Sequence, residues 1–301
     1  MSDFKYILIC GTQKAGTTSL FQYLADHPDI CPSSVKETGF FLEPTYSFYK
    51  PRVYQYINGI EQFNHYFTAC NQQRIRLEGT PSYLYSLKAP LFIRESLPDV
   101  LLLFMLREPI SRLISLYRYL RQIALIDYKL SFDEFVQAQI NVQKWTGFNS
   151  LYSGRYSEYL PNYFKIFSSE ELKVYKFTEL INSPQKILMS ICNSMNIDPS
   201  IYEKYGFAVH NQSFGVRNYH IHNLYLKIGE QFSRSKYPTK PRLQSFLQAI
   251  KGNWDKIYNP INLMRESPVA ISDQTRSFLE EFYGGEVEAL SRILGSEEFS
   301  W

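Results

Sequence analysis

Residues 6–20, YILICGTQKAGTTSL, join an apolar run directly to a glycine-containing loop and to the start of a helical pattern. The apolar run is too short for a buried helix and predicts a strand. The pattern after the loop places Leu20, Phe21 and Leu24 on one helical face. A loop between a strand and a helix presents unpaired backbone N–H groups at the positive end of the helix dipole. The stretch therefore predicts an anion-binding loop at the start of an α/β fold.

Further short apolar or alternating runs alternate with helical patterns along the chain. The runs are residues 74–78, 100–106 and 172–177, and a helical pattern covers residues 109–120. Strands that alternate with helices form parallel sheets that are covered on both faces. We therefore expect a three-layer α/β fold, P-loop-like in its first loop, with a mostly parallel central sheet flanked by helices.

The chain is expected to form one domain over residues 1–301, because this length is within reach of a single large core. The strand and helix patterns define a core over residues 5–220 and weaken over the C-terminal extension 221–301. A helical pattern near residues 273–294, interrupted at Gly284-Gly285, closes the extension. We expect this final helix to pack on the core.

The composition is that of a globular protein. Of the 301 residues, 45% are hydrophobic, 20% are charged and 16% are aromatic, a mix that excludes disordered, collagen-like and coiled-coil classes. The net charge of +3 is too weak to attract nucleic acid by bulk electrostatics. We expect no nucleic-acid partner, and we expect any anion site to be local.

Four scattered cysteines, Cys10, Cys31, Cys70 and Cys192, lack the spacing of a zinc site or of a dense disulfide framework. We expect them to be separate buried or half-buried thiols in a reducing compartment. No stretch approaches the roughly 18 apolar residues of a membrane span, and the first apolar run is shorter than that of a signal peptide. A cytoplasmic protein without a membrane span is therefore expected.

The first loop differs from that of a nucleoside-triphosphate P-loop. In a P-loop the Lys directly follows the last Gly and precedes a Ser or Thr that holds magnesium. Here Lys14 precedes Gly16 by two residues, and Thr17 follows that glycine. The two hydroxyls of Thr17 and Thr18 and the charge of Lys14 still suit an anion. The loop predicts phosphate binding of a different kind, without a metal.

A second motif, LREPISRLIS at residues 106–115, begins at the end of the run 100–106. Pro109 fits the first turn of a helix, which places Arg107 at the carboxyl end of a strand and Ser115 roughly 9 Å down the helix from Pro109. Ligands of open α/β sheets bind at this edge, and the planar fork of an Arg suits an anion there. A local pair between Arg107 and Glu108 is the alternative.

Together the two motifs resemble the sulfotransferase superfamily that uses 3′-phosphoadenosine 5′-phosphosulfate (PAPS). Two further stretches are similar to the glycan (heparan-sulfate-type) and bacterial branch: residues 36–41, KETGFF, resemble its K-E-x-x-F-F, and residues 78–83, EGTPSY, resemble its E-K-T-P-x-Y. The resemblance covers about residues 5–220 and the last 30 residues. It implies transfer of the sulfuryl group of PAPS to a hydroxyl acceptor by a bacterial-type enzyme that needs no metal.

The resemblance also implies roles for individual residues. Lys14 stabilises the leaving oxygen, and Glu37 is the general base, with His65 as the second choice. Arg107 and Ser115 bind the 3′-phosphate, and Arg217 is a further contact to it. The loop that binds the phosphosulfate comprises Lys14, Ala15, Gly16, Thr17, Thr18 and Ser19. A local pair of Glu37 with Lys36 is the alternative to the role as base.

Gly79 stands where the glycan branch carries a Lys in E-K-T-P-x-Y. The loss of that cation favours a neutral sugar, a lipid or an acyl chain over an acceptor as acidic as heparan. We expect a small-molecule, glycan or carrier-bound hydroxyl acceptor. The aromatic segment from Tyr46 to Phe67 either contacts an apolar or sugar-type acceptor or packs as a lid.

Two other functions stay open. A P-loop small-molecule kinase would use ATP and magnesium, although Lys14 is misplaced for it. A nucleotide-binding module with a degenerate site would bind a nucleotide without turnover.

Overall fold

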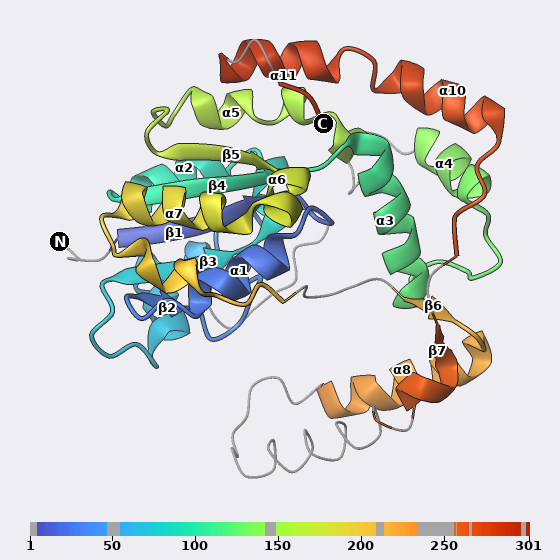
Figure 1. Ribbon diagram of the computed structural model, residues 1–301, viewed down its shortest axis with the longest axis horizontal. Coiled ribbons are helices and arrows are strands. Elements are labelled where there is room, and N and C mark those ends of the chain that lie inside the picture. Colours follow the sequence, from blue (N-terminus) through green and yellow to red (C-terminus); the bar gives the residue numbers. More distant parts are fainter. Residues whose placement is uncertain are drawn as a thin grey trace.

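The computed structural model shows a five-stranded sheet with helices on both faces (Figure 1). The strand order is β2-β3-β1-β4-β5, and every neighbouring pair is parallel. The strands are β1 Lys5–Gly11, β2 Ile30–Pro32, β3 Ile75–Gly79, β4 Val100–Leu106 and β5 Leu172–Lys176. The described residues are 5–46, 55–141, 149–208, 214–233, 256, 258–264, 267–295 and 299–301. The predicted fold class is confirmed.

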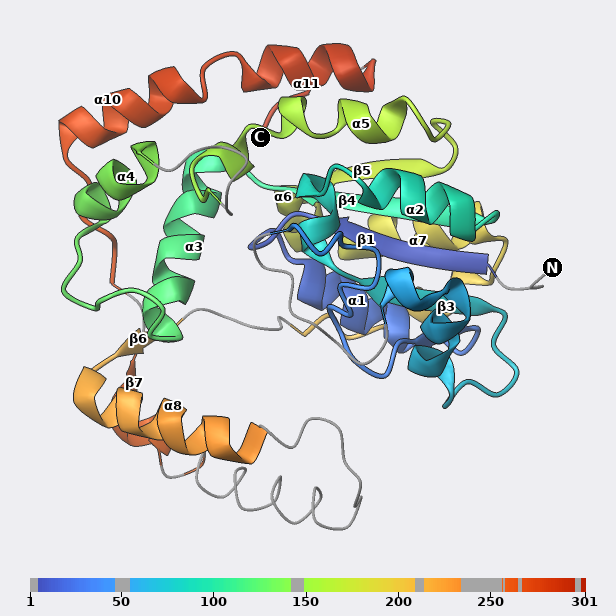
Figure 2. The ribbon, with the colours of Figure 1, turned by 180° about the vertical axis from the view of Figure 1, so that it is seen from behind.

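Alternate residues of the central strands enter two different apolar clusters. Ile7 and Ile9 of β1 pack with helices α1, α6 and α7, whereas Leu8 packs with α2, α5 and α11 on the opposite face. Figures 1 and 2 show these two layers from opposite sides. The helices are α1 Thr17–Ala25, α2 Ala89–Ser96, α5 Pro161–Phe164, α6 Phe177–Asn182, α7 Pro184–Met195 and α11 Glu286–Leu294. All seven residues of β4 are buried, as a central parallel strand requires.

A third apolar cluster lies beside the sheet. It joins the buried faces of α3, α4 and α10 through residues such as Leu113, Phe135 and Leu279. These helices are α3 Pro109–Gln122, α4 Phe132–Ile140 and α10 Asp273–Phe282. The chain turns between α10 and α11 at Gly285, which has a φ of 86°, so the predicted break at Gly284-Gly285 is confirmed.

A small two-stranded antiparallel sheet and one helix lie at the far end of α3 (Figure 1). Strand β6 Gly215–Val216 pairs with β7 Leu263–Met264, and α8 Tyr219–Ser233 follows β6. Short 3₁₀ helices connect the main elements: η1 Tyr56–Asn58, η2 Ile60–Phe67, η3 Pro81–Tyr85, η4 Tyr152–Gly154, η5 Tyr156–Glu158 and η6 Pro199–Glu203. No helix among the described residues is both long enough and apolar enough to cross a bilayer.

Most described aromatic side chains of the segment from Tyr46 to Phe67 pack into the core. Phe63, Tyr66 and Phe67 of η2 are buried in the cluster that covers one face of the sheet. Tyr56 stacks on Phe92 of α2, with ring centroids 4.3 Å apart. Residues 47–54 of the segment lie outside the described part of the chain. Phe63, Tyr66 and Phe67 therefore pack against the sheet, and contact with an acceptor stays a prediction for the partly exposed Tyr46 and Tyr56.

One expectation about the cysteines is wrong. Cys31, in β2, forms a disulfide with Cys70, with the two Cα atoms 5.7 Å apart. The other two, Cys10 and Cys192, are free and buried, as expected. The bond ties the edge strand β2 to the segment between η2 and β3, two places that are distant in sequence and adjacent in the fold.

Candidate functional site

The predicted anion-binding loop lies between β1 and α1. Gly16 is the residue before α1 and has a φ of 83°, a left-handed conformation that glycine adopts without cost. A Cβ at this position would lie 2.7 Å from Cδ2 of Leu180, so the packing against α6 also requires glycine. No described side chain caps the first turn of α1. Its backbone N–H groups are therefore suited to hold an anion.

The side chains of the loop divide into two groups. Ala15, Thr17 and Ser19 are buried, so Ala15 in particular contributes through its backbone. Lys14 and Thr18 are partly exposed, and the Lys14 Nζ lies 4.4 Å from the ring centroid of Tyr119 on α3. The loop thus directs its cation across the edge of the sheet toward α3.

Arg107 connects the loop to the second motif. It follows β4 directly, and its guanidinium donates a hydrogen bond of 3.1 Å to the carbonyl oxygen of Lys14. The guanidinium also lies 4.5 Å from the ring centroid of Phe177. Burial lowers the pKa of Arg107, although the nearby Tyr156 and the Glu108 carboxylate act in the opposite direction. A bound anion would stabilise the charged form of this side chain.

Glu108 caps the first turn of α3. Its carboxylate accepts hydrogen bonds from the backbone N–H groups of Ile110 at 2.8 Å and Ser111 at 2.6 Å, which makes it the N-cap of α3. A negative charge at this end of a helix also complements the helix dipole. Arg107 is therefore positioned by the loop and by Phe177 and remains able to bind a ligand through its other N–H groups.

Two serines follow on α3. Ser111 lines a pocket of about 500 Å³ together with Arg107 and Arg118. Ser115, the residue predicted to bind an anion, is 8% exposed and is absent from the described lining of that pocket. Both serines lie on the helix that begins at the carboxyl edge of the sheet, as the motif predicted.

Glu37 reaches the same edge from a separate turn. Its backbone N–H donates to the carbonyl oxygen of Gly79 at the end of β3, 3.0 Å away. Its carboxylate is 54% exposed and lies 2.8 Å from the Lys36 Nζ, so the local ion pair considered from the sequence exists. Burial raises the pKa of Tyr119, and the Glu37 carboxylate raises it further. The Lys14 ammonium thus contacts the Tyr119 ring, and the Glu37 carboxylate is near enough to raise the pKa of Tyr119.

Sequence analysis missed Tyr119. It lies four residues after Ser115, which is one turn further along the same helix face. That spacing is the signal that could have identified it.

A buried carboxylate holds the turn that carries Glu37. Oε1 of Glu78, a fully buried residue, accepts hydrogen bonds of 3.0 Å from the backbone N–H and from the hydroxyl of Thr38, and one of 2.6 Å from Thr80. The Thr80 hydroxyl in turn accepts from the Gly39 N–H at 3.0 Å. Burial raises the pKa of Glu78, although these hydrogen bonds act in the opposite direction. This positioning role was also missed by sequence analysis.

His65 does not join this edge of the sheet. It is exposed on η2, and its neighbour Asn64 accepts a hydrogen bond from Arg76. Arg76 lies near the start of β3 and pairs with Tyr6 near the start of β1. Since Lys14 follows the opposite end of β1, the structure separates His65 from the loop.

Arg217 also lies away from Arg107. It is exposed after β6, and its backbone N–H donates to the Asn262 carbonyl oxygen at 2.9 Å. Strand β6 and Gln122, in the last turn of α3, line one pocket, and α3 is about 20 Å long. Arg107 lies at the other end. Residues 209–213, which precede Arg217 in the predicted phosphate-closing stretch, lie outside the described chain.

Comparison with protein families gives one match that covers most of the chain. The family model described as sulfotransferase domain matches residues 5–241. These residues include both motifs, the Glu37 turn and the whole central sheet.

Among curated proteins, the chain is similar to two kinds of sulfotransferase. It is 31% identical over 115 residues to the membrane-associated sulfotransferase kil1 of Dictyostelium discoideum, covering 37% of this chain and 22% of that protein. It is 24% identical over 196 residues to heparan sulfate glucosamine 3-O-sulfotransferase 5 of Mus musculus, covering 64% of this chain and 54% of that protein. The chain spans about half or less of the length of these relatives.

A solved structure shares the fold. The sulfotransferase from Alicyclobacillus acidocaldarius superposes with a TM-score of 0.63 at 18% sequence identity, covering 98% of this chain and 97% of that one.

Proposed function

Because the chain belongs to the sulfotransferase domain family, we propose that it transfers a sulfuryl group from PAPS to an acceptor hydroxyl. The hydrogen bond between Arg107 and the Lys14 carbonyl oxygen carries the proposal. This contact joins two separate anion-binding elements at the carboxyl edge of one parallel sheet. A cosubstrate with phosphate groups at two ends needs such a pair of sites.

The chemistry requires three things from the protein. The acceptor oxygen forms a bond to sulfur while the bond between sulfur and the bridging phosphate oxygen breaks, and the bridging oxygen keeps the electron pair. The protein must therefore align the two oxygens, stabilise the growing negative charge and accept the acceptor's proton. As in phosphoryl transfer, alignment and charge stabilisation are the main contributions of the protein.

The loop and α3 supply the binding groups in this proposal. The N–H groups at Gly16, Thr17 and Thr18 bind the sulfated phosphate, and the Lys14 ammonium stabilises the leaving oxygen. Arg107, which precedes α3, and Ser115 on α3 bind the 3′-phosphate. His65 and Arg217 have no role, because their positions do not bring them to this edge.

Glu37 is the general base in this proposal. Its carboxylate is half-exposed, so an acceptor can reach it. Its influence on Tyr119, together with the contact of Lys14 with the same ring, supports a position near the leaving group. The acceptor is a hydroxyl on a sugar, lipid or acyl chain.

Calorimetry with two nucleotides tests the proposal. We expect tight binding of 3′,5′-adenosine bisphosphate (PAP) without a metal, and weak binding of ATP with magnesium. A preference for ATP and magnesium would overturn the proposal in favour of a kinase. Binding of PAP with no turnover of PAPS across sugar, lipid and acyl acceptors would indicate a nucleotide-binding module.

The disulfide bears on where the protein functions. Disulfides persist in oxidising compartments and are rare in the cytosol, and the expected cytoplasmic location depended partly on reduced cysteines. The Cys31–Cys70 bond supports an oxidising compartment instead, and this location is part of the proposal. Alkylation of free thiols in the denatured protein from its native host should label two of the four cysteines, and labelling of all four would contradict it.

A further inference from the structure

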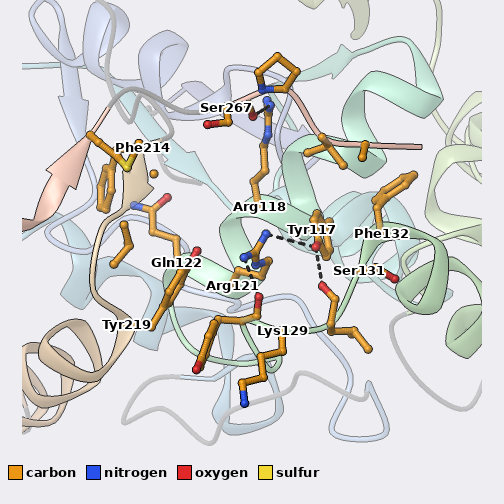
Figure 3. A pocket seen from close by; sticks show the side chains of 18 residues that line it. Tyr117, Arg118, Arg121, Gln122, Lys129, Ser131, Phe132, Phe214, Tyr219 and Ser267 are labelled. Carbon is orange, nitrogen blue, oxygen red and sulfur yellow. Dashed lines mark hydrogen bonds between the residues drawn. The ribbon is translucent and has the colours of Figure 1, made fainter. Parts of the chain in front are cut away.

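Helix α3 carries arginines at positions 112, 118 and 121, and their surroundings differ. Arg118 and Arg121 line a pocket beside the end of the helix that is far from Arg107 (Figure 3). Arg112 is the fourth residue of the helix, and it is fully enclosed, with 0% of its surface exposed. None of the roles proposed above uses this buried cation.

Arg112 has no acidic partner among the described residues. Its Nη2 donates to the Ser150 carbonyl oxygen at 2.6 Å. Its Nε and Nη1 are buried and reach no hydrogen-bond partner in the described part of the chain. Glu108, four residues earlier, uses its carboxylate to cap the helix. A buried charge without an opposite charge destabilises a fold, so packing alone does not explain an arginine here.

Three tyrosines interact with the Arg112 charge without neutralising it. They are Tyr156, Tyr85 and Tyr283, and their electrostatic interactions with Arg112 raise its pKa against the effect of burial. Burial raises the pKa of each of the three phenols, although the Arg112 charge lowers it. The phenols therefore stay protonated at neutral pH and offer dipoles, but no negative charge.

Two of these tyrosines contact the two anion-binding elements. The Tyr156 hydroxyl donates to the Arg107 carbonyl oxygen at 2.8 Å. The Tyr85 hydroxyl forms a hydrogen bond with the hydroxyl of Thr12, which directly follows β1. Arg112 therefore lies behind the place where the first loop and the second motif meet.

The Arg112 charge also acts on Arg107. Burial lowers the pKa of Arg107, although Tyr156 and Glu108 act in the opposite direction. The positive charges of Arg118 and Arg112 act with burial. The charge that repels a guanidinium at this place attracts an anion there, and a buried charge is less screened by water and salt than an exposed one.

We propose that Arg112 is a buried charge that serves cosubstrate binding: its field stabilises the phosphates that Arg107 and the loop hold. The bound cosubstrate supplies the negative charge that Arg112 otherwise lacks. Arg112 does not touch the ligand, because its side chain is enclosed. The inference rests on the proposed function, because it concerns the cosubstrate of the same reaction.

The test compares the neutral variant Arg112→Met with Arg112→Lys, which keeps the charge. Calorimetry measures the affinities for PAP, which has two phosphates, and for AMP, which has one. Arg121→Met is the matched control. Arg121 also has a buried Nε without a described partner and a hydrogen bond with a tyrosine hydroxyl, that of Tyr117 at 3.2 Å. It lies nine residues further along α3, about 13.5 Å away.

We expect Arg112→Met to reduce PAP affinity about tenfold or more. The loss for AMP should be smaller, because the interaction scales with the charge of the ligand. Arg112→Lys should recover most of the PAP affinity, and Arg121→Met should leave it unchanged.

Without ligand, Arg112→Met should be at least as stable as the wild type, because replacing an uncompensated buried charge by an apolar side chain removes its desolvation cost. The Ser150 carbonyl oxygen keeps another donor, the Ser153 hydroxyl at 2.9 Å. Denaturant midpoints measure the stability of each variant. Saturating PAP should raise the midpoint of Arg112→Met less than that of the wild type.

Unchanged PAP affinity in Arg112→Met, or equal losses for PAP and AMP, would overturn the inference while leaving the proposed function intact. An Arg112→Met variant that is less stable than the wild type or fails to fold would also overturn it, because Arg112 would then serve the fold. An equal loss of PAP affinity in Arg121→Met would do the same. Failure of the wild-type protein to bind PAP at all would instead contradict the proposed function.

Discussion

At the scale of single residues, Arg107 connects both anion-binding motifs through the Lys14 carbonyl oxygen. Replacing it with Ala should weaken PAP binding by about 10- to 100-fold, since hydrogen bonds to charged groups contribute about 1.5–3 kcal/mol. Binding of adenosine 5′-phosphosulfate, which lacks the 3′-phosphate, should change far less. Calorimetry with both ligands measures the difference.

The matched control is Arg217→Ala. Sequence analysis assigned this residue to the same phosphate, but it lies after β6 at the far end of α3. We expect Arg217→Ala to leave PAP affinity unchanged. Equal losses for both nucleotides in Arg107→Ala would show that Arg107 acts on the loop and not on the 3′-phosphate.

Glu37 gives a second residue-scale prediction. Glu37→Gln removes a proton acceptor while keeping the size of the side chain, and general-base catalysis contributes about 10²–10⁴-fold. Turnover with PAPS should fall by that range, and PAP affinity should stay within about twofold. The ion pair with Lys36 is exposed, so its loss should affect stability little.

Glu61→Gln, on an exposed position of η2, is the control for that measurement. This variant also removes one exposed carboxylate, but from a residue that lies outside the anion-binding loop. Unchanged turnover in Glu37→Gln would assign the base to another group.

Lys14 and Arg107 could be identified from the sequence because local patterns determine their positions. Lys14 lies in a loop before a helix, and Arg107 follows the end of an apolar strand. Tyr119 and Glu78 could not be identified in the same way. Tyr119 matters because α3 brings its ring to the Lys14 ammonium, and Glu78 matters because Thr38 folds onto the end of β3. Both relations join segments at least 40 residues apart in sequence.

At the scale of elements, Glu78 gives stability a pH dependence. Burial raises the pKa of Glu78 in the folded protein. Its contribution to the free energy of unfolding is therefore complete below the ordinary carboxyl pKa and is lost as the pH rises through the pKa of the folded state. Its Oε2 is buried without a hydrogen-bond partner among the described residues, which adds to the cost of ionisation.

Glu78→Gln should therefore become more stable relative to the wild type as the pH rises from 4 to 8. Denaturant midpoints at several pH values measure this difference, and Glu95→Gln on α2, which removes a carboxylate from another element, is a control. A difference between Glu78→Gln and wild type that does not vary with pH would show that Glu78 ionises in the folded state as it does in the unfolded chain.

Four of the five strands could be predicted within one residue, because each combines a short apolar run with flanking turns. Strand β2 was missed since it has only three residues and ends at Pro32, and proline normally argues against a strand interior. For the aromatic residues of η2 the sequence left two alternatives open, contact with an acceptor or packing. Composition shows that a segment buries its rings, but not which layer receives them.

At the scale of the whole molecule, the disulfide closes a loop with a sequence separation of 39 residues. A loop of this size corresponds to a stabilisation of about 4 kcal/mol in the chain-entropy description. Reduction should lower the free energy of unfolding by up to this amount, measured by denaturant unfolding with and without reductant. The double variant Cys31→Ala, Cys70→Ala should be insensitive to reductant.

Equal unfolding midpoints for the oxidised and reduced wild-type protein would contradict the bond. Sequence alone could not pair these cysteines. Their contact depends on η2 packing next to β2, where the Ser34 N–H donates to the Tyr66 carbonyl oxygen. The three-layer arrangement, by contrast, follows from the alternation of strands and helices along the chain. That alternation can be read from local sequence patterns alone.

The edge strand β2 has a consequence for behaviour at high concentration. Open strand edges can pair with the edges of other molecules and start aggregation. Here the edge next to β3 has only three residues, ends in a proline that lacks an N–H donor, and is linked by the disulfide to a neighbouring segment. The protein is therefore protected against edge-to-edge association on this side. Loss of the disulfide should reduce its solubility during refolding.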